Sequence, residues 1–462
     1  MKGKGILMYD LIVVGAGAGG YTAAIQGAKQ GLKVAMIEMG EIGGLCLNRG
    51  CIPTKFLIRT ASEYRRASDA IEGRFYDGRL SLNYEKIVEE MGKKISSLSS
   101  GIQALLKGNG VECFQGRAKL VSSHKLWIDS GVELESKNII FAAGSVQETL
   151  PIKGIDSHKV YTTDQMFYGM KTVPESLVII GAGIIGLEMA FLFRNLGTQV
   201  TLIEKKNSLL ESWDKDAQNW MLRILKRNGI KIYLGCCVKE ICDDGELHIV
   251  ANDITNKKRI SADNILIAMG RRPNVEGLGL ETAGIEFNGR GIETDSNYQT
   301  NVKGIYAVGD VNGKEMLAYA ASQQALQAIG HIIGEERQKA GVIPKCIFSQ
   351  PELAMAGIGE TDAENLGYDV CTGKFLMTAN GRSAIDGHDG FIKIVAEKNT
   401  KIILGGVCAC HLATELISQI SMAVLAKMTI HDFARMIQPH PTYSEALGEA
   451  VRMVDKNSIY ML

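Results

Sequence analysis

The fold is decided by the stretch Tyr9–Gly20, which reads YDLIVVGAGAGG. Its apolar first half, Tyr9–Val14, predicts a strand, and the glycine-rich turn behind it opens an Ala-rich helix that ends near Gly31. A second strand is expected over 33–37, with Glu38 at its end. Strand, Gly-x-Gly-x-x-Gly turn, helix, strand and acid, in that order, predict a unit that binds a dinucleotide.

Each part of this unit has a physical task. Gly15, Gly17 and Gly20 let the backbone approach a pyrophosphate, which the helix N-terminus holds. Glu38 is placed to accept a hydrogen bond from a ribose hydroxyl.

The same unit recurs later in the chain. Its glycines are Gly181, Gly183 and Gly186, and its acid is Glu204. In both units the acid follows the first glycine by 23 positions. The flanking strands are expected over 177–180 and 200–203, with a helix over 187–196 between them. Two such units predict two dinucleotides bound at once; the alternative is one working site and one structural relic.

A pair of cysteines stands in the stretch Gly43–Lys55, GGLCLNRGCIPTK. On a regular helix Cys46 and Cys51 would lie roughly 140° apart, so a disulfide between them requires a distorted first turn. The glycines before Cys46 make that distortion easier. A strained and accessible dithiol of this kind is suited to thiol–disulfide exchange.

The composition is that of an ordinary globular protein of several domains. The chain has 462 residues, 46% hydrophobic and 22% charged, with a net charge of +0. The charge balance gives no reason to expect nucleic acid or an anionic membrane as a partner. No apolar run has membrane-spanning length, and Met1–Met8 does not form a signal peptide, so we expect a cytoplasmic protein.

Eight further cysteines lie outside the pair. We expect them to be small buried residues, because their spacing is irregular. Cys408-Ala-Cys410 with His411 lacks the further ligands of a zinc site, so no metal is expected.

Further elements follow from the pattern of apolar residues. A polar helix is expected over 84–107, and Asp310 follows a strand at a sheet edge where ligands bind. The other expected strands are 138–143, 265–268, 304–308, 391–396 and 402–408, and the other expected helices begin at Ala318 and span 415–427.

Taken together, these stretches resemble the flavin-dependent pyridine-nucleotide disulfide oxidoreductases of class I. The resemblance covers nearly the whole chain and rests on YDLIVVGAGAGGYTAA, GGLCLNRGCIPTK, GAGIIGLEMA, IAMGRRPN, GIYAVGD and PHPTYSE. It implies an α/β protein with two Rossmann-like dinucleotide-binding domains, for FAD and NAD, and a C-terminal α+β dimerisation domain. The implied boundaries are 1–148 for the FAD domain with the dithiol, 149–270 for the NAD domain, 271–342 for a central segment that returns to the FAD domain, and 343–462 for the interface domain.

The resemblance also assigns cofactor-binding residues. Gly15, Gly17, Gly20 and Glu38 would bind the ADP half of FAD, and the backbone near Ala118, Gly144, Asp310 and Ala318 the rest of it. The nicotinamide nucleotide would lie against Gly181, Gly183, Gly186, Glu204, Val238 and Gly270. Lys55 and Glu188 look like the family's ion pair beside the flavin and the nicotinamide.

The reacting groups follow in the same way. Cys46 would be the interchange thiol and Cys51 the thiolate that faces the flavin. His440 and Glu445 look like the acid–base pair that serves the dithiol of the other subunit of a homodimer. An imidazole titrates in the range needed to take a thiol proton. Without the cysteines, His440 would be read as an ordinary loop histidine between two prolines.

The second acid bears on the choice of nucleotide. Glu204 should accept from the 2′-hydroxyl of NAD and repel the 2′-phosphate of NADP, whereas Lys205 and Lys206 could pair with a phosphate. The glutathione-reductase type carries arginines at the positions of Glu204 and Leu210, and both are absent here. We therefore expect NAD.

Within the family, the chain is most similar to the branch that oxidises protein-bound dihydrolipoyl groups. The tail lacks the cysteine pair of the mercuric-reductase and large thioredoxin-reductase branches. The implied partners are the lipoyl domains of 2-oxo acid dehydrogenase or glycine cleavage systems. The alternatives are a reductase of another small disulfide or quinone, and a subunit whose main role is to bind a complex.

Three positions depart from that branch. Gln438-Pro439 replaces a histidine and a small residue, Cys410-His411 replaces a common Gly-Pro, and Tyr319 replaces a frequent histidine.

Overall fold

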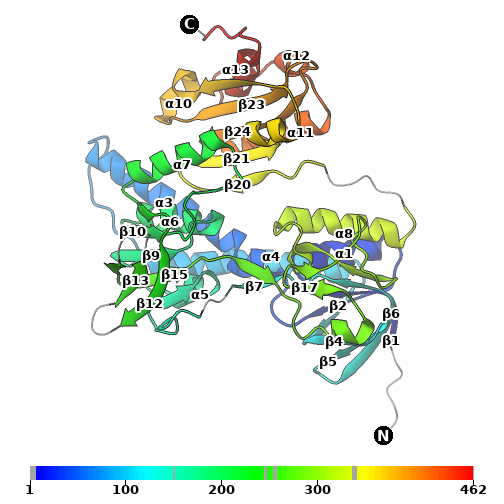
Figure 1. Ribbon diagram of the computed structural model, residues 1–462. Coiled ribbons are helices and arrows are strands. Elements are labelled where there is room, and N and C mark those ends of the chain that lie inside the picture. The colour runs from blue at the N-terminus through cyan, green and yellow to red at the C-terminus, as the bar shows by residue number, and fades with distance from the viewer. Residues whose placement is uncertain (1–6, 149–150, 244–246, 253–256, 336–340, 461–462) are drawn as a thin grey trace.

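The structure, a computed structural model, describes residues 7–148, 151–243, 247–252, 257–335 and 341–460. Two largely parallel sheets stand side by side, and a third, antiparallel sheet lies above them in Figure 1. The predicted architecture, two Rossmann-like units and a C-terminal α+β part, is confirmed. In the part of the chain that the structure describes, no helix is long and apolar enough to cross a membrane.

The first sheet carries the first glycine turn at its centre. Its strand order is β3-β2-β1-β6-β5-β4, and β1 pairs in parallel with β2 on one side and β6 on the other. The long strand β6 pairs with β5 along its first half and with β19 along its second. The elements are β1 (Leu7–Val14), α1 (Ala18–Lys29), β2 (Val34–Glu38), β3 (Glu112–Gln115), β4 (Ala118–Ser122), β5 (Lys125–Ile128), β6 (Val132–Phe141), β19 (Ile305–Ala307) and α8 (Ala318–Ile332). Helices α1 and α8 pack against each other (Figure 1).

The second sheet repeats this plan. Its order is β11-β10-β9-β15-β8, all parallel, with the strand before the second glycine turn again at the centre. The elements are β8 (Val160–Thr162), α5 (Thr163–Gly169), β9 (Ser176–Ile180), α6 (Ile184–Asn195), β10 (Gln199–Ile203), α7 (Lys215–Arg227), β11 (Lys231–Tyr233) and β15 (Asn264–Ile267).

Several short strands lie outside the two main sheets. An antiparallel sheet of β12 (Cys237–Asp243), β13 (Leu247–Asn252) and β14 (Lys257–Ser261) extends the second unit. Two-stranded pairs join β7 (Ser145–Gln147) to β16 (Arg271–Pro273) and β17 (Phe287–Asn288) to β18 (Gly291–Ile292). Three of these strands adjoin predicted site residues: β7 follows Gly144, β16 follows Gly270, and β12 contains Val238.

Helices α2 (Gly44–Arg49), α3 (Cys51–Glu72) and α4 (Tyr84–Gly108) follow the strand that ends in the first acid. Helix α3 packs against both α4 and α6, so it joins the two units. The predicted polar helix over 84–107 is confirmed as α4, which buries Met91 and Ile95.

The C-terminal sheet has the order β20-β21-β24-β23-β22. Helix α11 packs against β21 and β24, and α13 packs against β22 and β23. The elements are β20 (Lys345–Ile347), β21 (Glu352–Gly357), α9 (Glu360–Asn365), β22 (Val370–Leu376), α10 (Gly381–Asp386), β23 (Phe391–Glu397), β24 (Ile403–Cys410), α11 (Ala413–Leu425), α12 (Ile430–Ala434) and α13 (Glu445–Val454).

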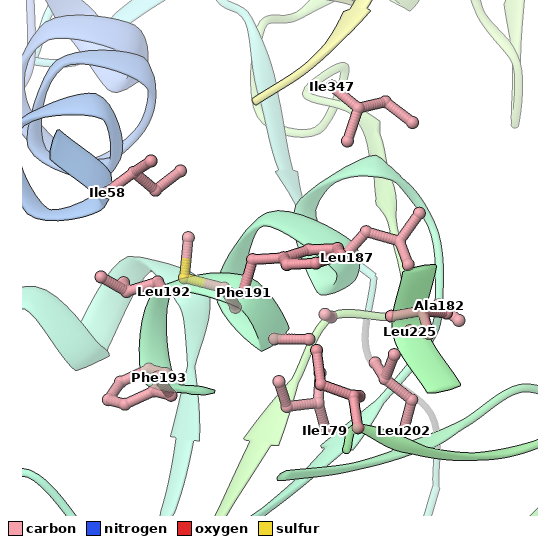
Figure 2. Close-up of a cluster of buried hydrophobic side chains, with 14 of the residues drawn as sticks. Ile58, Ile179, Ala182, Leu187, Phe191, Leu192, Phe193, Leu202, Leu225 and Ile347 are labelled. Atoms are coloured by element: carbon pink, nitrogen blue, oxygen red, sulfur yellow. The ribbon is translucent and has the colours of Figure 1, made fainter. Parts of the chain in front are cut away.

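One apolar core connects the parts that will form the site. Ile58 of α3, Phe191 of α6 and Ile347 of β20 belong to the same cluster of buried side chains, which Figure 2 shows around Leu187. Burying a side chain such as Phe191 contributes about 1.5–3 kcal/mol. This packing fixes α3, α6 and β20 relative to one another, and each of them carries a residue of the candidate site.

Candidate active site

The two cysteines lie on consecutive helices that are interrupted at Gly50. Cys46 lies on α2 and Cys51 is the first residue of α3. The predicted distortion is therefore a complete break. A Cβ atom at Gly50 would lie 3.0 Å from the Leu45 carbonyl oxygen, so glycine suits the turn. Gly43, at the start of α2, has a φ of 104°, which an L side chain rarely adopts.

The two thiols differ in acidity. Both are free in the structure, and Cys46 donates a hydrogen bond to the sulfur of Cys51. That hydrogen bond lowers the pKa of Cys51 to about 7; burial opposes the shift, the charge of Lys55 adds to it, and Glu188 opposes it. Cys46 keeps its proton, and the same hydrogen bond together with burial raises its pKa. Above about pH 7 the pair therefore carries one thiolate, on Cys51.

An ion pair lies one helical turn from this thiolate. Lys55 follows Cys51 by four residues on α3, and its Nζ lies 2.9 Å from both carboxylate oxygens of Glu188 on α6. Glu188 is buried and also accepts a hydrogen bond of 3.1 Å from the backbone N–H of Phe348, just after β20. The ring of Phe348 lies 4.3 Å from Lys55 Nζ, a cation–π contact. Three separate parts of the chain therefore hold one positive charge beside Cys51.

Each glycine turn forms a cradle that a side chain would fill. A Cβ at Gly20 would lie 1.8 Å from the Gly15 carbonyl oxygen, and a Cβ at Gly186 would lie 1.9 Å from that of Gly181. Nothing lies within 4 Å of a Cβ built on Gly183, so that face is open to a ligand. Both cradles fit a dinucleotide whose pyrophosphate approaches the backbone.

The two acids are held in the same manner. Glu38 accepts hydrogen bonds from the backbone N–H groups of Ala16 (2.6 Å) and Gly40 (2.7 Å). Glu204 accepts from those of Ala182 and Lys206, both at 2.9 Å. Each carboxylate is thereby fixed beside its own glycine turn, with a lone pair left on each oxygen for a ribose hydroxyl.

A single cavity of about 1220 Å³ joins the cysteines, the ion pair and both glycine turns. It exceeds the roughly 300–1,000 Å³ of a typical small-molecule site, as two nucleotides require. The predicted residues that line it are Gly17, Cys46, Cys51, Lys55, Gly144, Gly181, Gly183, Glu188, Glu204, Val238, Gly270, Asp310 and Ala318. The predicted residues outside its lining are Gly15, Gly20, Glu38, Ala118, Gly186, His440 and Glu445.

One polar network in the cavity was not predicted. The Asp310 carboxylate accepts a hydrogen bond of 2.6 Å from Ser145 Oγ, which in turn accepts one of 2.9 Å from Arg271 Nε. Arg271 also forms an ion pair with Asp164 at 2.8 Å. Burial raises the pKa of Asp310, and Ser145 and Arg271 partly offset this effect. The signal available in the sequence was the position of Ser145 and Arg271, each directly after a predicted glycine.

The wall near the ion pair holds three further residues that the sequence analysis did not place there. Cys346 and Phe348 lie two positions apart on and after β20, and both line the cavity. Tyr319, the second residue of α8, also lines it and donates a hydrogen bond to the carbonyl oxygen of Pro344. The departure at Tyr319 thus links α8 to the segment that leads into β20.

His440 and Glu445 are brought together, but away from the cavity of their own chain. His440 Nδ1 lies 2.8 Å from Glu445 Oε1, and the other carboxylate oxygen accepts from the Thr442 backbone N–H at 2.7 Å. Burial raises the pKa of Glu445, and the hydrogen bonds from Thr442 and His440 outweigh it, so the net shift is downward. The side chain of His440 is 78% exposed. This pair, here called the dyad, faces outward from the subunit.

The expectation of eight buried cysteines is wrong. Only Cys236, Cys408 and Cys410 are buried, whereas Cys113 and Cys237 are exposed. Cys113 lies on the edge strand β3 and Cys237 begins β12, so strand alternation turns their side chains outward. Among the residues that the structure describes, no three His, Cys, Asp or Glu side chains are grouped to hold a metal ion.

Comparison with known proteins shows which family has this combination of domains. Residues 9–325 match the family described as pyridine nucleotide-disulphide oxidoreductase, and residues 343–451 match the dimerisation domain of that family. The chain therefore carries the part through which these proteins form homodimers.

The chain is also similar to individual curated proteins over nearly its full length. It is 36% identical to the dihydrolipoyl dehydrogenase of Thermus scotoductus over 461 residues, with 98% of this chain and 99% of the relative covered. It is 36% identical to the dihydrolipoyl dehydrogenase of Geobacillus stearothermophilus, with 98% and 97% covered.

Solved structures have the same fold. The HOCl-induced flavoprotein disulfide reductase RclA of Escherichia coli aligns with a TM-score of 0.88 at 26% identity, over 96% of this chain and 100% of that one. LpdA of Mycobacterium tuberculosis aligns with a TM-score of 0.88 at 25% identity, over 97% and 99%.

These matches agree with the two cradles, the dithiol and the C-terminal sheet. The cofactors are FAD and NAD, and the enzyme is an NAD-dependent oxidoreductase that acts on sulfur groups. The chain belongs to the pyridine nucleotide-disulphide oxidoreductases.

Proposed function

We propose that this enzyme oxidises protein-bound dihydrolipoyl groups to lipoyl groups and reduces NAD to NADH. The observation that carries the proposal is the single cavity that joins the dithiol, the Lys55–Glu188 ion pair and both glycine turns. The dihydrolipoyl dehydrogenases to which the chain is similar give the substrate class.

The unequal acidity of the cysteines sets the order of the exchange. A disulfide breaks so that the more acidic thiol leaves, and Cys51 has the lower pKa. A substrate thiolate therefore bonds to the Cys46 sulfur, the Cys46–Cys51 bond breaks, and Cys51 leaves as thiolate. The second substrate thiol then loses its proton and displaces Cys46, which takes up a proton, as its raised pKa requires. The substrate has become a cyclic disulfide, and its two electrons reside on the cysteine pair.

The proton carrier in this proposal is the partner subunit's His440. In its own subunit the dyad does not line the cavity, whereas a second copy joined through the C-terminal part can present it to Cys46. Glu445 orients the imidazole through Nδ1, so the other ring nitrogen is the one that exchanges protons with thiols.

The remaining predicted residues would hold the two nucleotides. Gly15, Gly17, Gly20 and Glu38 would hold the ADP part of FAD, and Ala118, Gly144, Asp310 and Ala318 the rest. Gly181, Gly183, Gly186, Glu204, Val238 and Gly270 would hold NAD. When bound, FAD supplies two-electron transfer between a thiol pair and NAD. Lys55 supplies the fixed positive charge that stabilises Cys51 as thiolate, and Glu188 keeps Lys55 in place.

The partners proposed are the lipoyl domains of 2-oxo acid dehydrogenase or glycine cleavage systems. The proposed division of the chain is 1–148, 149–270, 271–342 and 343–462, with the third segment returning to the first sheet through β19. The proposed compartment is the cytoplasm, because a labile dithiol cycles best in reducing surroundings.

The test is NADH formation from dihydrolipoamide by the FAD-loaded protein, followed by absorbance. Cys46→Ser should lower the rate by at least about a thousandfold, because no disulfide can form. The matched control is Cys113→Ser, which changes an exposed cysteine outside the cavity and should leave the rate unchanged.

Two results would contradict the proposal. One is a protein that oxidises NADH with another small disulfide or a quinone but never turns over dihydrolipoamide. The other is a Cys46→Ser variant with full dihydrolipoamide activity, which would leave complex binding as the main role.

A further inference from the structure

Three aromatic rings in contact, here called the stack although the third ring meets the second edge-on, support the stretch 439–445 that carries the dyad. The rings of His388 and His411 have centroids 4.6 Å apart at an angle of 35°. The ring of Tyr443 follows 5.5 Å from His411 at 62°. His388 precedes β23, His411 directly follows β24, and Tyr443 lies two residues before Glu445, so the stack joins three separate segments.

The outer end of the stack is tied to the dyad. Tyr443 is buried, and its hydroxyl donates a hydrogen bond of 2.9 Å to Asp386. Asn380 donates to the Thr442 carbonyl oxygen at 3.0 Å, and the Thr442 N–H donates to Glu445. Tyr443 and the Asn380 amide therefore hold the backbone that places Glu445, and through it His440.

The inner end of the stack is tied to the second unit. Asp389, next to His388, forms an ion pair with Arg227 of α7. His388 Nε2 is buried and has no hydrogen-bond partner among the described residues, so the ring is held by packing alone on that side. An imidazole in this state is stable only while it is neutral.

The charges around the pair oppose a proton on either ring. Arg66 of α3 and Arg382 of α10 face it with positive charge, and Asp386 and Asp389 face it with negative charge. Arg227 and Arg223 neutralise Asp389, and Arg382 pairs with Asp386 at 2.8 Å. Each nearby carboxylate is thus already matched by an arginine. Burial, the neighbouring ring and Arg66 lower the pKa of His411 to about 4, and burial and Arg66 lower that of His388.

We propose that His388 and His411 are positioning residues for the dyad: as a neutral stacked pair they hold Tyr443 and the stretch 439–445, and a proton on the pair releases that stretch. This inference rests on the acid–base role given to His440 in the proposed function. It predicts that protonation of the His388–His411 pair lowers activity in acid, in addition to any effect of protonating His440 or Glu445.

The test uses His411→Phe, which keeps a ring in the stack and removes the titrating nitrogens of His411. The first readout is the hydrogen-exchange protection of the Thr442 amide, corrected for intrinsic rates, in the free protein. Between about pH 7 and about pH 4.5, wild-type protection should fall at least about tenfold, because the released rings would titrate at their ordinary pKa near 6.5. In His411→Phe the protection should fall clearly less over the same range, because only His388 can still take up a proton.

The second readout is the pH profile of kcat for dihydrolipoamide oxidation. His411→Phe should extend the acid limb to lower pH without changing kcat near pH 8. His411→Arg, a permanent charge at the same place, should lower kcat at every pH and lower the protection of Thr442. The matched control is His431→Arg in the exposed helix α12, which should change neither quantity.

Equal protection profiles for wild type and His411→Phe would overturn the inference, as would a His411→Arg variant with unchanged protection. If His411→Phe does not fold, His388→Phe makes the same test from the other ring. Protection is measured without substrate, so its outcome does not depend on the proposed function. A protein that fails to oxidise dihydrolipoamide would refute the proposed function, whereas the protection of Thr442 would still test the role of the histidine pair.

Discussion

At the scale of single residues, the acidity of Cys51 has three local causes. It is the first residue of α3, it accepts a hydrogen bond from Cys46, and Lys55 lies one turn further along the same helix. The amino end of a helix carries partial positive charge, which stabilises a thiolate. The break at Gly50 is what places Cys51 at that end.

The thiolate should be visible by its effect on bound flavin. In Cys46→Ser the second sulfur cannot form a disulfide, so Cys51 titrates alone. We expect a long-wavelength absorption band that appears as pH rises through a midpoint above about 7, because the Cys46 hydrogen bond, the largest cause of the lowered Cys51 pKa, is lost while Lys55 remains. A thiolate forms above its pKa, so the band must grow with pH. Lys55→Met should move the midpoint upward by about one unit or more. A band that is absent at all pH values, or a midpoint unaffected by Lys55→Met, would contradict this assignment.

The residues most accessible to sequence reasoning are those in dense local motifs. Cys46, Cys51 and the glycines were identified from a few neighbouring positions, and the structure places both cysteines and one or two glycines of each turn around one cavity. Ser145, Asp164 and Arg271 were missed, because their network forms only after distant segments fold together. A serine or an aspartate alone carries no such signal.

At the scale of elements, the two glycine turns are equivalent in geometry, and the proposed function assigns a different nucleotide to each. Gly20→Ala should weaken FAD binding at least about tenfold, because its Cβ would overlap the Gly15 carbonyl oxygen. Gly186→Ala should leave FAD bound and raise the KM for NAD by a similar factor. FAD content by absorbance and steady-state kinetics measure the two effects.

The matched control is Gly92→Ala on α4, where a Cβ would meet nothing within 4 Å. It should stabilise the protein by about 0.5–1 kcal/mol and change neither the FAD content nor the KM for NAD. Loss of both nucleotides in either turn variant would show that the two units do not act separately.

A buried lysine fastens α7 to the C-terminal sheet. Lys393 on β23 is 4% exposed, and its Nζ lies 3.0 Å from Asp214 and Asp216 and 2.5 Å from Glu360. Asp214 is also the residue that caps α7. Lys393→Met should lower the free energy of unfolding by about 3–5 kcal/mol, because it leaves Asp214 buried without its partner.

Lys374 provides the comparison for this variant. It pairs with Asp216 at 2.8 Å but is 39% exposed, so Lys374→Met should cost about 0–1 kcal/mol. Denaturant unfolding measures both. Equal effects of the two substitutions would mean that burial does not determine the strength of this contact.

Most of the elements in the two units were predicted, because strand, glycine turn and helix are signalled within short windows. The strands β3, β4, β5 and β8, the helices α5 and α7, the sheet β12–β14 and the ion cluster of Lys393 were not. A lysine in a strand normally predicts an exposed position, and only the arrival of α7 and α9 from elsewhere makes Lys393 a buried partner. The pairing register between strands that are distant in the sequence likewise cannot be predicted from short sequence windows.

At the scale of the whole molecule, the site is divided between two places on one chain. The dithiol lies in the cavity, and the exposed dyad lies outside the cavity lining. A shared site in a homodimer therefore predicts complementation. Cys46→Ser and His440→Ala homodimers should each be inactive. Dissociated and reassociated as a mixture, they should recover about a quarter of wild-type activity, because half of the dimers are mixed and each has one complete site.

Sedimentation must confirm that mixed dimers form, and a mixture of Cys46→Ser with Cys51→Ser, which should stay inactive, is the control. An inactive mixture of the first pair would mean that each subunit uses its own His440. An active monomer would mean the same.

The central claim is that electrons pass from a dihydrolipoyl group through the Cys46–Cys51 pair to NAD in one cavity. The most direct measurement is the visible spectrum of the FAD-loaded protein under anaerobic conditions while dihydrolipoamide, then NAD, is added. We predict a flavin spectrum that gains a long-wavelength thiolate band with dihydrolipoamide and loses it with NAD as NADH appears. A flavin that responds to NADH but never to dihydrolipoamide would contradict the claim.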